Sequence, residues 1–257
     1  MFRKSLRRGS SLKTHFRRPV PARRKAHKRS GTTSLGRLWR FVVRKVSMVL
    51  LAYYGFCTLC LLLFNVVNPP TTGVQMQRRV ESWFGDASYT KHHHSVSREA
   101  LSIHLRHAVI AAEDARFYEH WGLDWQAIRQ AFKDNRHPRR ARRGGSTITQ
   151  QLVKNLFMTT HSTYLRKVLE VPLAYLAEIL LSKERILDLY LNVIEWDTGV
   201  YGAEAAAQRY YGTSAKMLAR PQAAALAACI PAPRSRTPQR MNRYTDIILR
   251  RMREMNW

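Results

Sequence analysis

The feature that most constrains this chain is an uncharged run of 22 residues, Val46–Val67. As a helix the run would be about 33 Å long at 1.5 Å per residue, enough to cross a hydrocarbon core of about 30 Å. Arg44 and Lys45 precede it, and an Asn-Pro-Pro segment at 68–70 stops the helix on its far side. The run therefore predicts a single transmembrane anchor at 46–67. It is longer than the apolar part of a cleaved signal peptide, and the basic residues before it place the N-terminus in the cytoplasm.

Most of the net charge lies ahead of this run. Of the 44 Lys and Arg residues, 16 lie within residues 1–45, and the first acidic residue of the chain is Glu81. Like charges with few apolar neighbours cannot offset the entropy lost on ordering, so residues 1–45 are expected to form a disordered cytoplasmic tail that touches anionic lipids. A nucleic-acid-binding arm is the alternative. It ranks last, and no nucleic acid is expected as a partner, because the tail and the later domain would lie on opposite sides of the membrane.

Residues 68–100 are polar and weakly patterned, so they are expected to form a linker that leads into a domain at 101–257. Three adjacent histidines stand at 92–94. Adjacent side chains on regular structure cannot all face one ion, so a solvated loop is favoured over a metal site. From about residue 100, apolar residues recur at helical spacing, and the alternation typical of strands is nearly absent. The domain is therefore expected to be mainly α-helical.

The first candidate for chemistry is the segment EDARFYEHWG at 113–122. Glu113 stands beside an apolar helical stripe and is followed by aromatic residues, a setting that desolvates a carboxylate and raises its pKa towards the range useful for proton transfer. The alternative is a structural acid at a helix end, paired with Arg116 or His120.

The second segment is GGSTITQQLVKN at 144–155, and six basic residues lie just before it in 133–143. Small residues followed by hydroxyl and amide side chains allow a polar ligand to approach closely, and the basic residues favour an anionic one. The spacing is not that of a P-loop. A tight turn followed by an N-capped helix is the alternative.

The third segment is RKVLE at 166–170, in which Arg166 and Glu170 lie on one helical face at i, i+4. A surface ion pair is the default interpretation, and such a pair contributes little to stability. A polar groove built on helices is favoured here, because further polar residues follow at Lys183, Tyr190, Asn192 and Glu195.

In this order the chain resembles the family 51 glycosyltransferases, the peptidoglycan glycosyltransferase modules of class A penicillin-binding proteins and of monofunctional enzymes. The resemblance covers roughly residues 85–235 and rests on EDARFYEHWG, GGSTITQQLVKN, RKVLE, KERILDLYLN and GVYGAEAAAQRYYG. It implies a lysozyme-like, mainly α-helical fold with a small membrane-dipping hydrophobic part. The implied reaction joins a polyprenyl-pyrophosphate-linked strand to the 4-hydroxyl of lipid II, with inversion, to form a β-1,4 bond.

The resemblance also implies roles for single residues. Glu113 matches the catalytic base, and Glu170 matches a second glutamate near the donor sugar and pyrophosphate. It leaves open whether Glu170 holds a divalent ion such as Mg²⁺ or Mn²⁺, and it implies no other cofactor. The remaining matches are donor-groove residues for sugar and phosphate oxygens and cations for the pyrophosphate: Ser146, Gln150, Gln151, Lys154, Arg166 and Lys167.

One position departs from the family pattern. Many members carry a basic residue four positions before the Arg-Lys pair, where this chain has Ser162, with His161 beside it. The departure is expected to weaken the hold on the pyrophosphate without changing the assignment. Nothing after residue 235 could hold a penicillin-binding transpeptidase, so the chain resembles the monofunctional kind.

Two other functions remain as alternatives. A lytic murein-cleaving enzyme on a similar fold would explain one glutamate among aromatic residues, but not a second one beside Arg-Lys, nor the anchor. A non-catalytic scaffold would recruit cell-wall synthesis or division proteins through the anchor and tail. The favoured prediction is a single-pass enzyme of the bacterial inner membrane, with its domain on the periplasmic side, where it meets membrane lipids and lipid-linked substrate.

Overall fold

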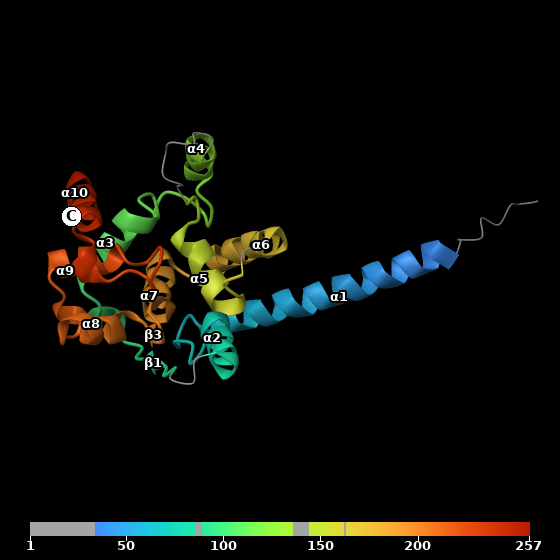
Figure 1. Ribbon diagram of the computed structural model, residues 1–257. Coiled ribbons are helices and arrows are strands. Elements are labelled where there is room, and N and C mark those ends of the chain that lie inside the picture. Colours follow the sequence, from blue (N-terminus) through green and yellow to red (C-terminus); the bar gives the residue numbers. More distant parts are fainter. Residues whose placement is uncertain (1–33, 86–88, 136–143, 162) are drawn as a thin grey trace, which may run out of the picture. The chain divides into compact units, whose positions relative to one another are not determined.

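The computed structural model describes residues 34–85, 89–135, 144–161 and 163–257. The chain divides into two units, residues up to Ser47 and Met48–Trp257, and each is described by itself. The longer helices are α1 (Ser34–Leu63), α2 (Gly73–Phe84), α3 (Ile103–Glu113), α4 (Trp125–Asn135), α5 (Ile148–Phe157), α6 (Tyr164–Leu180), α7 (Lys183–Val193), α8 (Ala203–Tyr211), α9 (Arg220–Ala227) and α10 (Asn242–Glu254) (Figure 1).

Short elements complete the second unit. Among the described residues, 3₁₀ turns lie at Arg98–Ala100, Ala215–Met217 and Pro238–Arg240, and the strands are β1 (His92–His93), β2 (Glu195–Asp197) and β3 (Val200–Tyr201). The prediction of a mainly α-helical domain is confirmed.

The helix predicted at 46–67 begins and ends earlier, at Ser34 and Leu63. It starts within the predicted tail because residues 34–45 contain no proline and a single glycine, so nothing there interrupts a helix. Residues Gly36–Leu63 are long and apolar enough to cross a membrane. Residues 1–33 of the predicted tail lie outside the described part.

The last turns of α1 pack against the domain rather than serving only as a lipid-facing span. Cys57 and Leu61 are fully buried in the core of the second unit. The Arg185 guanidinium then donates to the carbonyls of Phe64 and Val67, each at 2.7 Å. Both carbonyls follow the end of α1 and have no helical partner, so Arg185 satisfies them where the chain leaves the helix.

In the segment expected to be a solvated histidine loop, His92 and His93 form a strand instead, although His92 and His94 are exposed as expected. In the small sheet of order β1-β3-β2, β1 is parallel and β2 antiparallel to β3. The His93 ring Nε2 donates to the Asn192 carbonyl at 2.9 Å. Gly202 has φ +84°, and a Cβ there would lie 2.8 Å from the same carbonyl. Two residues are too short for an alternating pattern, so only the tertiary partners define this strand.

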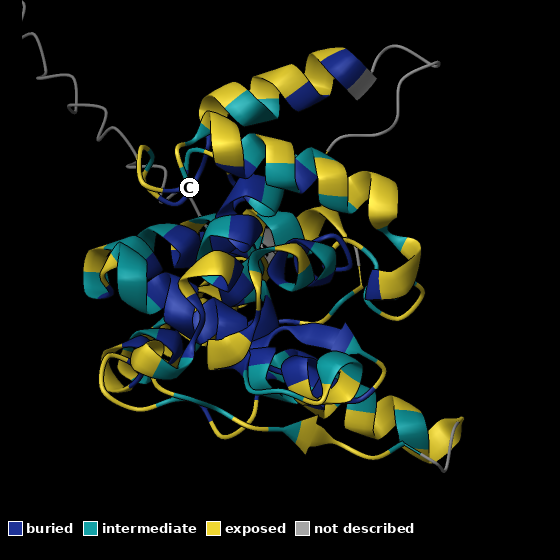
Figure 2. Ribbon diagram, turned by 90° about the vertical axis from the view of Figure 1, so that its left-hand side faces the viewer, coloured by how far each residue is buried: buried dark blue, intermediate teal, exposed yellow. Residues whose placement is uncertain are grey.

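The core of the domain is centred on α5 and α7. All of residues 186–193 in α7 are buried, and α5 packs against α2, α6 and α7. A second packed group is formed by α3, α9 and α10. In Figure 2 the dark blue, buried segments gather at the centre, while the outer faces of the helices are yellow. Both glutamate-bearing helices, α3 and α6, therefore rest on a rigid scaffold.

Candidate active site

Glu113 is the last residue of α3. The helix begins where the Ser102 hydroxyl accepts the His104 N–H at 3.2 Å. Its inner stripe, including Leu105 and Val109, is fully buried. The side-chain cap and the apolar stripe fix the axis of α3, and so the place where Glu113 emerges.

An arginine of α10 holds the end of α3. Arg251 Nη1 donates to the carbonyl of Ala111 at 3.1 Å and to that of Ala112 at 3.5 Å. These carbonyls belong to the last turn of the helix, which carries the negative end of the helix dipole. A cation there stabilises the turn that ends in Glu113. No pattern in the sequence singled out Arg251.

The carboxylate of Glu113 is held by neutral side chains. Gln151 Nε2 of α5 donates to Glu113 Oε2 at 2.7 Å, and the Tyr190 hydroxyl of α7 donates to Gln151 Oε1 at 2.7 Å. Neither Arg116 nor His120 pairs with Glu113 among the described contacts, contrary to the structural alternative. Three helices thus converge on this carboxylate through a Tyr–Gln–Glu chain.

Burial raises the pKa of Glu113 above the ordinary value for glutamate. The hydrogen bond from Gln151 and the positive charges of Lys154 and Arg236 oppose this rise without cancelling it. A carboxylate with a raised pKa is a stronger base than an exposed one, and its neutral partners leave its lone pairs available. The side chain is therefore suited to accept a proton.

A pocket of about 380 Å³ opens beside Glu113, between α3, α9 and α10. Its lining includes apolar Ile247 and Ile248 and cationic Arg243 and Arg251. Glu113 is the one carboxylate among the described residues that line it. A ligand hydroxyl can thus reach a single base from an otherwise cationic and apolar pocket.

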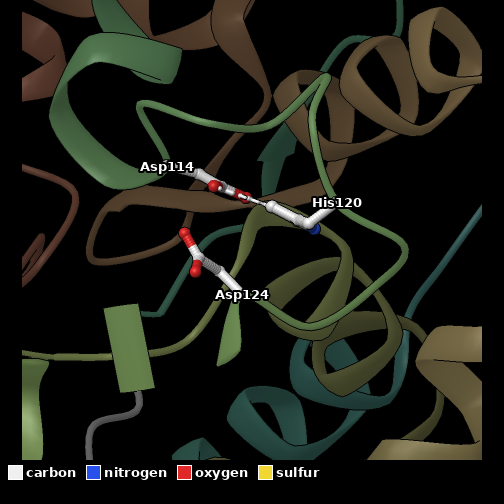
Figure 3. A group of neighbouring side chains, drawn as sticks. All are labelled: Asp114, His120 and Asp124. Atoms are coloured by element: carbon white, nitrogen blue, oxygen red, sulfur yellow. Dashed lines mark hydrogen bonds and ion pairs between the residues drawn. The ribbon is translucent and has the colours of Figure 1, made fainter. Parts of the chain in front are cut away.

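The acid next in sequence, Asp114, has a structural role (Figure 3). Its carboxylate accepts from His120 Nε2 at 2.9 Å and from the Ile148 backbone N–H at 3.0 Å. Nearby Asp124 accepts from Arg116 Nε at 3.1 Å. These three side chains could group around a metal ion. However, their oxygens already accept internal hydrogen bonds, so the cluster ties the loop after Glu113 to the start of α5.

The start of α5 also explains why one predicted site residue points inward. Thr147 and Gln150 form a capping box in which Gln150 Oε1 accepts the Thr147 N–H at 3.2 Å. Gln150 is 1% exposed. Its amide oxygen is committed to the helix cap, and the role in donor binding that the family resemblance implies for Gln150 stays a prediction.

Glu170 lies in very different surroundings from Glu113. It is 1% exposed, and its oxygens accept from Arg166 Nη1 at 3.0 Å and Lys167 Nζ at 2.5 Å. Lys167 also donates to the Ser146 hydroxyl at 2.9 Å. The i, i+4 pair predicted from the sequence is therefore present, but buried at the carboxylate and extended into a network.

The cations of this network open onto a second pocket of about 460 Å³. It is lined by Ser146, Thr163, Tyr164, Arg166 and Lys167. No carboxylate is among these lining residues, because Glu170 lies beneath them. The exposed surface therefore offers hydroxyl and cationic donors, the groups that bind phosphate oxygens.

Lys154 interacts electrostatically with both glutamates. Burial lowers the pKa of this half-buried ammonium, the positive charges of Arg166 and Lys167 lower it further, and both glutamates raise it. Within the described part of the chain, the Lys154 ammonium has no hydrogen-bond or ion-pair partner. A half-buried cation without a partner is a site that an anion would stabilise.

The residues around Glu170 do not fit a divalent cation held by the protein. Arg166 and Lys167 occupy its two oxygens, and their charges repel a metal ion. Mg²⁺ and Mn²⁺ need several oxygen ligands, and among the described residues no other acid groups with Glu170.

The other polar residues expected in the groove have structural roles. Lys183 pairs with Glu178 at 2.8 Å, and Asn192 is fully buried and bonded to backbone groups. Glu195 pairs with Arg78 of α2 at 3.3 Å. Of that set, Tyr190 alone reaches the site, through Gln151. Ser162 and residues 136–143 of the basic segment lie outside the described residues.

The comparisons with known proteins agree with this geometry. A sequence model of a family described as Transglycosylase matches residues 79–253. The chain belongs to the transglycosylase family. It is thus a lysozyme-like helical domain behind one helix that could span a membrane.

Several relatives are named "Biosynthetic peptidoglycan transglycosylase". One from Dechloromonas aromatica is 52% identical over 61% of this chain and 70% of its own length. One from Herminiimonas arsenicoxydans is 45% identical over 72% and 82%. One from Methylobacillus flagellatus is 42% identical over 84% and 95%. The similarity to this transglycosylase therefore extends over most of both chains.

Proposed function

We propose that this chain is a peptidoglycan glycosyltransferase that polymerises lipid II into glycan strands. The donor is a strand linked to polyprenyl pyrophosphate, and the acceptor is the 4-hydroxyl of lipid II. The observation that carries the proposal is the division of the site into a lone basic carboxylate, Glu113, and a separate group of cations on α5 and α6. Glycosyl transfer from a pyrophosphate needs both.

In the proposed reaction, Glu113 accepts the proton of the 4-hydroxyl as its oxygen attacks the anomeric carbon of the donor. The new carbon–oxygen bond forms as the bond to the pyrophosphate oxygen breaks, and the electron pair leaves with the polyprenyl pyrophosphate. Attack from the face opposite the leaving group inverts the carbon and gives a β-1,4 bond. The raised pKa of Glu113 favours its role as base.

The leaving pyrophosphate is stabilised by Lys154, Arg166 and Lys167 in this proposal. Preorganised cations aimed at a developing negative charge lower the barrier because they do not have to reorient during the step. Ser146, bonded to Lys167, is positioned to donate to a phosphate or sugar oxygen. Gln151 orients Glu113 rather than the donor.

Glu170 is assigned a positioning role. Its buried carboxylate holds the Arg166 and Lys167 side chains over the second pocket. Without it the two cations would repel each other and spread into solvent. Glu170 therefore acts on the reaction through these cations.

The proposed location is the bacterial inner membrane, with α1 as a single-pass anchor. The basic residues before the apolar run favour a cytoplasmic N-terminus. The domain would then face the periplasm, where the lipid-linked substrate is consumed. The anchor keeps the enzyme at the surface that holds both its donor and its acceptor.

The test is polymerisation of lipid II by the purified full-length chain in detergent, with products resolved by gel. Glu113→Gln is expected to lower turnover by about 10²–10⁴-fold, the usual contribution of a general base, while binding of a pyrophosphate-bearing ligand is retained. Glu99→Gln, at an exposed acid, is the matched control and should keep wild-type turnover. Wild-type turnover in Glu113→Gln would refute the assignment, and release of soluble fragments from sacculi would favour the lytic alternative.

A further inference from the structure

The pocket beside Glu113 contains a cation that is free to meet a ligand. Residues of α10 line this pocket at positions i, i+1, i+4, i+5 and i+8 of one helical face: Arg243, Tyr244, Ile247, Ile248 and Arg251. Arg251 is committed to the carbonyls at the end of α3. Arg243 is exposed and has no hydrogen-bond or ion-pair partner among the described residues. A ligand in the pocket therefore meets one uncommitted guanidinium.

Arg243 lies at some distance from the base. Arg251 donates to the carbonyl of Ala112, the residue before Glu113, so Glu113 belongs to the Arg251 end of the pocket. Arg243 lies two helical turns before Arg251, which is about 12 Å along the axis of α10 at 1.5 Å per residue. Glu113 and Arg243 can therefore bind different parts of one ligand.

The rest of the pocket wall is mostly apolar. Besides the two isoleucines of α10, it is formed by small residues of α3, α9 and the segment that follows α9: Ala112, Ala227, Ala228 and Pro231. The volume of about 380 Å³ lies within the range of small-molecule sites. Such a wall accepts methyl groups and the C–H faces of sugar rings, and it adds no further charge. A negative charge on the ligand is therefore directed to Arg243.

Tyr244, next to Arg243, is held in place without a ligand. Arg236 Cζ lies 5.1 Å from the centre of the Tyr244 ring, and Arg236 Nη1 donates to the carbonyl of Ala228 at 3.0 Å. Tyr244 is still 48% exposed, so part of its side chain is open to the pocket. A side chain that is already held loses little rotational freedom on binding, which favours affinity.

The distribution of charge favours a carboxylate over a pyrophosphate in this pocket. The second pocket presents Arg166 and Lys167 together, and no carboxylate lines it, so it suits a multiply charged phosphate. The pocket beside Glu113 has Arg243 as its one uncommitted cation, and Glu113 must be ionised to act as a base, so it repels a dianion. One planar carboxylate can accept two parallel hydrogen bonds from a single guanidinium.

We propose that Arg243 binds a carboxylate of the acceptor and so selects acceptors that carry an acidic side arm. In lipid II this arm is the peptide, which is attached to the sugar next to the one with the reacting 4-hydroxyl. The inference rests on the proposed function and adds a specificity contact to it. With its hydroxyl at Glu113 and its carboxylate at Arg243, the acceptor is held at two points, which fixes the orientation of the attacking oxygen.

The test measures binding of a soluble probe to the full-length chain in detergent. The probe is the disaccharide–peptide of lipid II without its pyrophosphate and lipid, prepared with free carboxylates and with all of them amidated. Wild type should bind the free form about tenfold more tightly, the effect of one charge-assisted hydrogen bond. Arg243→Met should bind both forms equally weakly, and Arg243→Lys, which keeps the charge without the planar fork, should lie between. Arg253→Met is the matched control, because Arg253 is exposed on α10 outside the pocket.

Three results would overturn the proposal. Wild type could bind the two forms equally or fail to bind the free form, and Arg243→Met could keep the wild-type preference for the free form. Inorganic pyrophosphate is the competing ligand in the same titration. Its affinity should depend on Arg166 and not on Arg243, and a loss of pyrophosphate affinity in Arg243→Met would show that the pocket binds phosphate instead.

Polymerisation kinetics separate this inference from the proposed function. Arg243→Met should raise the KM for lipid II about tenfold and change kcat far less, because the contact serves acceptor binding, whereas Glu113→Gln should lower kcat. A wild-type KM in Arg243→Met, together with loss of turnover in Glu113→Gln, would refute the carboxylate contact alone. A wild-type chain that prefers the free probe but makes no polymer would refute the proposed function and leave the carboxylate contact standing.

Discussion

The two glutamates of the site show how partners decide what a carboxylate can do. Glu113 is half-buried and is held by a neutral amide, Gln151. Glu170 is fully buried and held by two cations, Arg166 and Lys167. A neutral donor orients a carboxylate and leaves it basic, whereas two cations neutralise it and use it as a support. The same residue type is therefore suited to proton transfer at one end and to organising positive charge at the other.

The largest effect that would sharpen this comparison is expected from Glu170→Gln. Loss of the negative charge leaves Arg166 and Lys167 to repel each other, so turnover should fall about 10²-fold, as when one preorganised electrostatic group is lost. Binding of a pyrophosphate-bearing ligand should weaken in parallel, which a titration would measure. Glu254→Gln is the control, because Glu254 forms an exposed i, i+4 pair with Arg250. Intact ligand binding in Glu170→Gln would break the proposed contrast.

Gln151→Leu tests the neutral end and should reduce turnover by about tenfold, less than the roughly 10²–10⁴-fold that a general base contributes, because Gln151 acts only through Glu113. The Gln151 hydrogen bond lowers the pKa of Glu113, so its loss should raise that pKa further. Glu113 must be deprotonated to act as base, so the acidic limb of the pH–rate profile should move to higher pH. Tyr190→Phe, which keeps Gln151, should move it less. A limb that stays in place would show that Gln151 does not tune Glu113.

Arg251→Met should lower the free energy of unfolding by about 1 kcal/mol, through the loss of a charged hydrogen-bond donor at the end of α3. Turnover should fall modestly as well, because the last turn of α3 carries Glu113. Arg250→Met is the control, since Arg250 is exposed and bonded only to Glu254 among the described contacts. Equal unfolding energies for the two variants, measured by denaturant titration, would remove Arg251 from this role.

The smallest expected effect is on thermal stability, because burying the ionised Glu113 carboxylate destabilises the fold. The pKa of Glu113 is higher in the folded chain than in the unfolded one. Its ionised form therefore destabilises the fold above the folded pKa, and the penalty disappears below the unfolded value of about 4.3. Glu113→Gln should melt on the order of 2 °C above wild type at pH 7. The gap should close as the pH falls below 4.3, and a gap that widened instead would contradict the raised pKa.

The sequence predicted those parts of the site that depend on local periodicity. Helical spacing alone brings Arg166 to Glu170, and the apolar stripe before Glu113 correctly predicted a desolvated acid. It could not predict the Tyr190–Gln151–Glu113 chain, because that contact depends on how α3, α5 and α7 pack. Arg251 was missed for the same reason. The capping role of Gln150 was not predicted, because a capping amide and a ligand-binding amide have the same sequence signature.

The fold was predicted with similar limits. Helical content follows from apolar spacing, but β1 has two residues and depends on its neighbours β3 and Asn192. The predicted end of the anchor lies after the observed end of α1 at Leu63. The sequence cannot show that one side of residues 57–61 packs against protein rather than lipid. Apolar side chains suit both environments equally well.

Helix α5 fixes the spacing between the two halves of the site. Gln151 donates a hydrogen bond to Glu113. Lys154 follows three residues later, so it lies on the same face of the helix, where both glutamates raise its pKa. Inserting or deleting one residue between Gln151 and Lys154 would rotate one side chain about 100° away from the other. The segment should therefore tolerate volume-conserving substitutions on its buried far face better than any change of length.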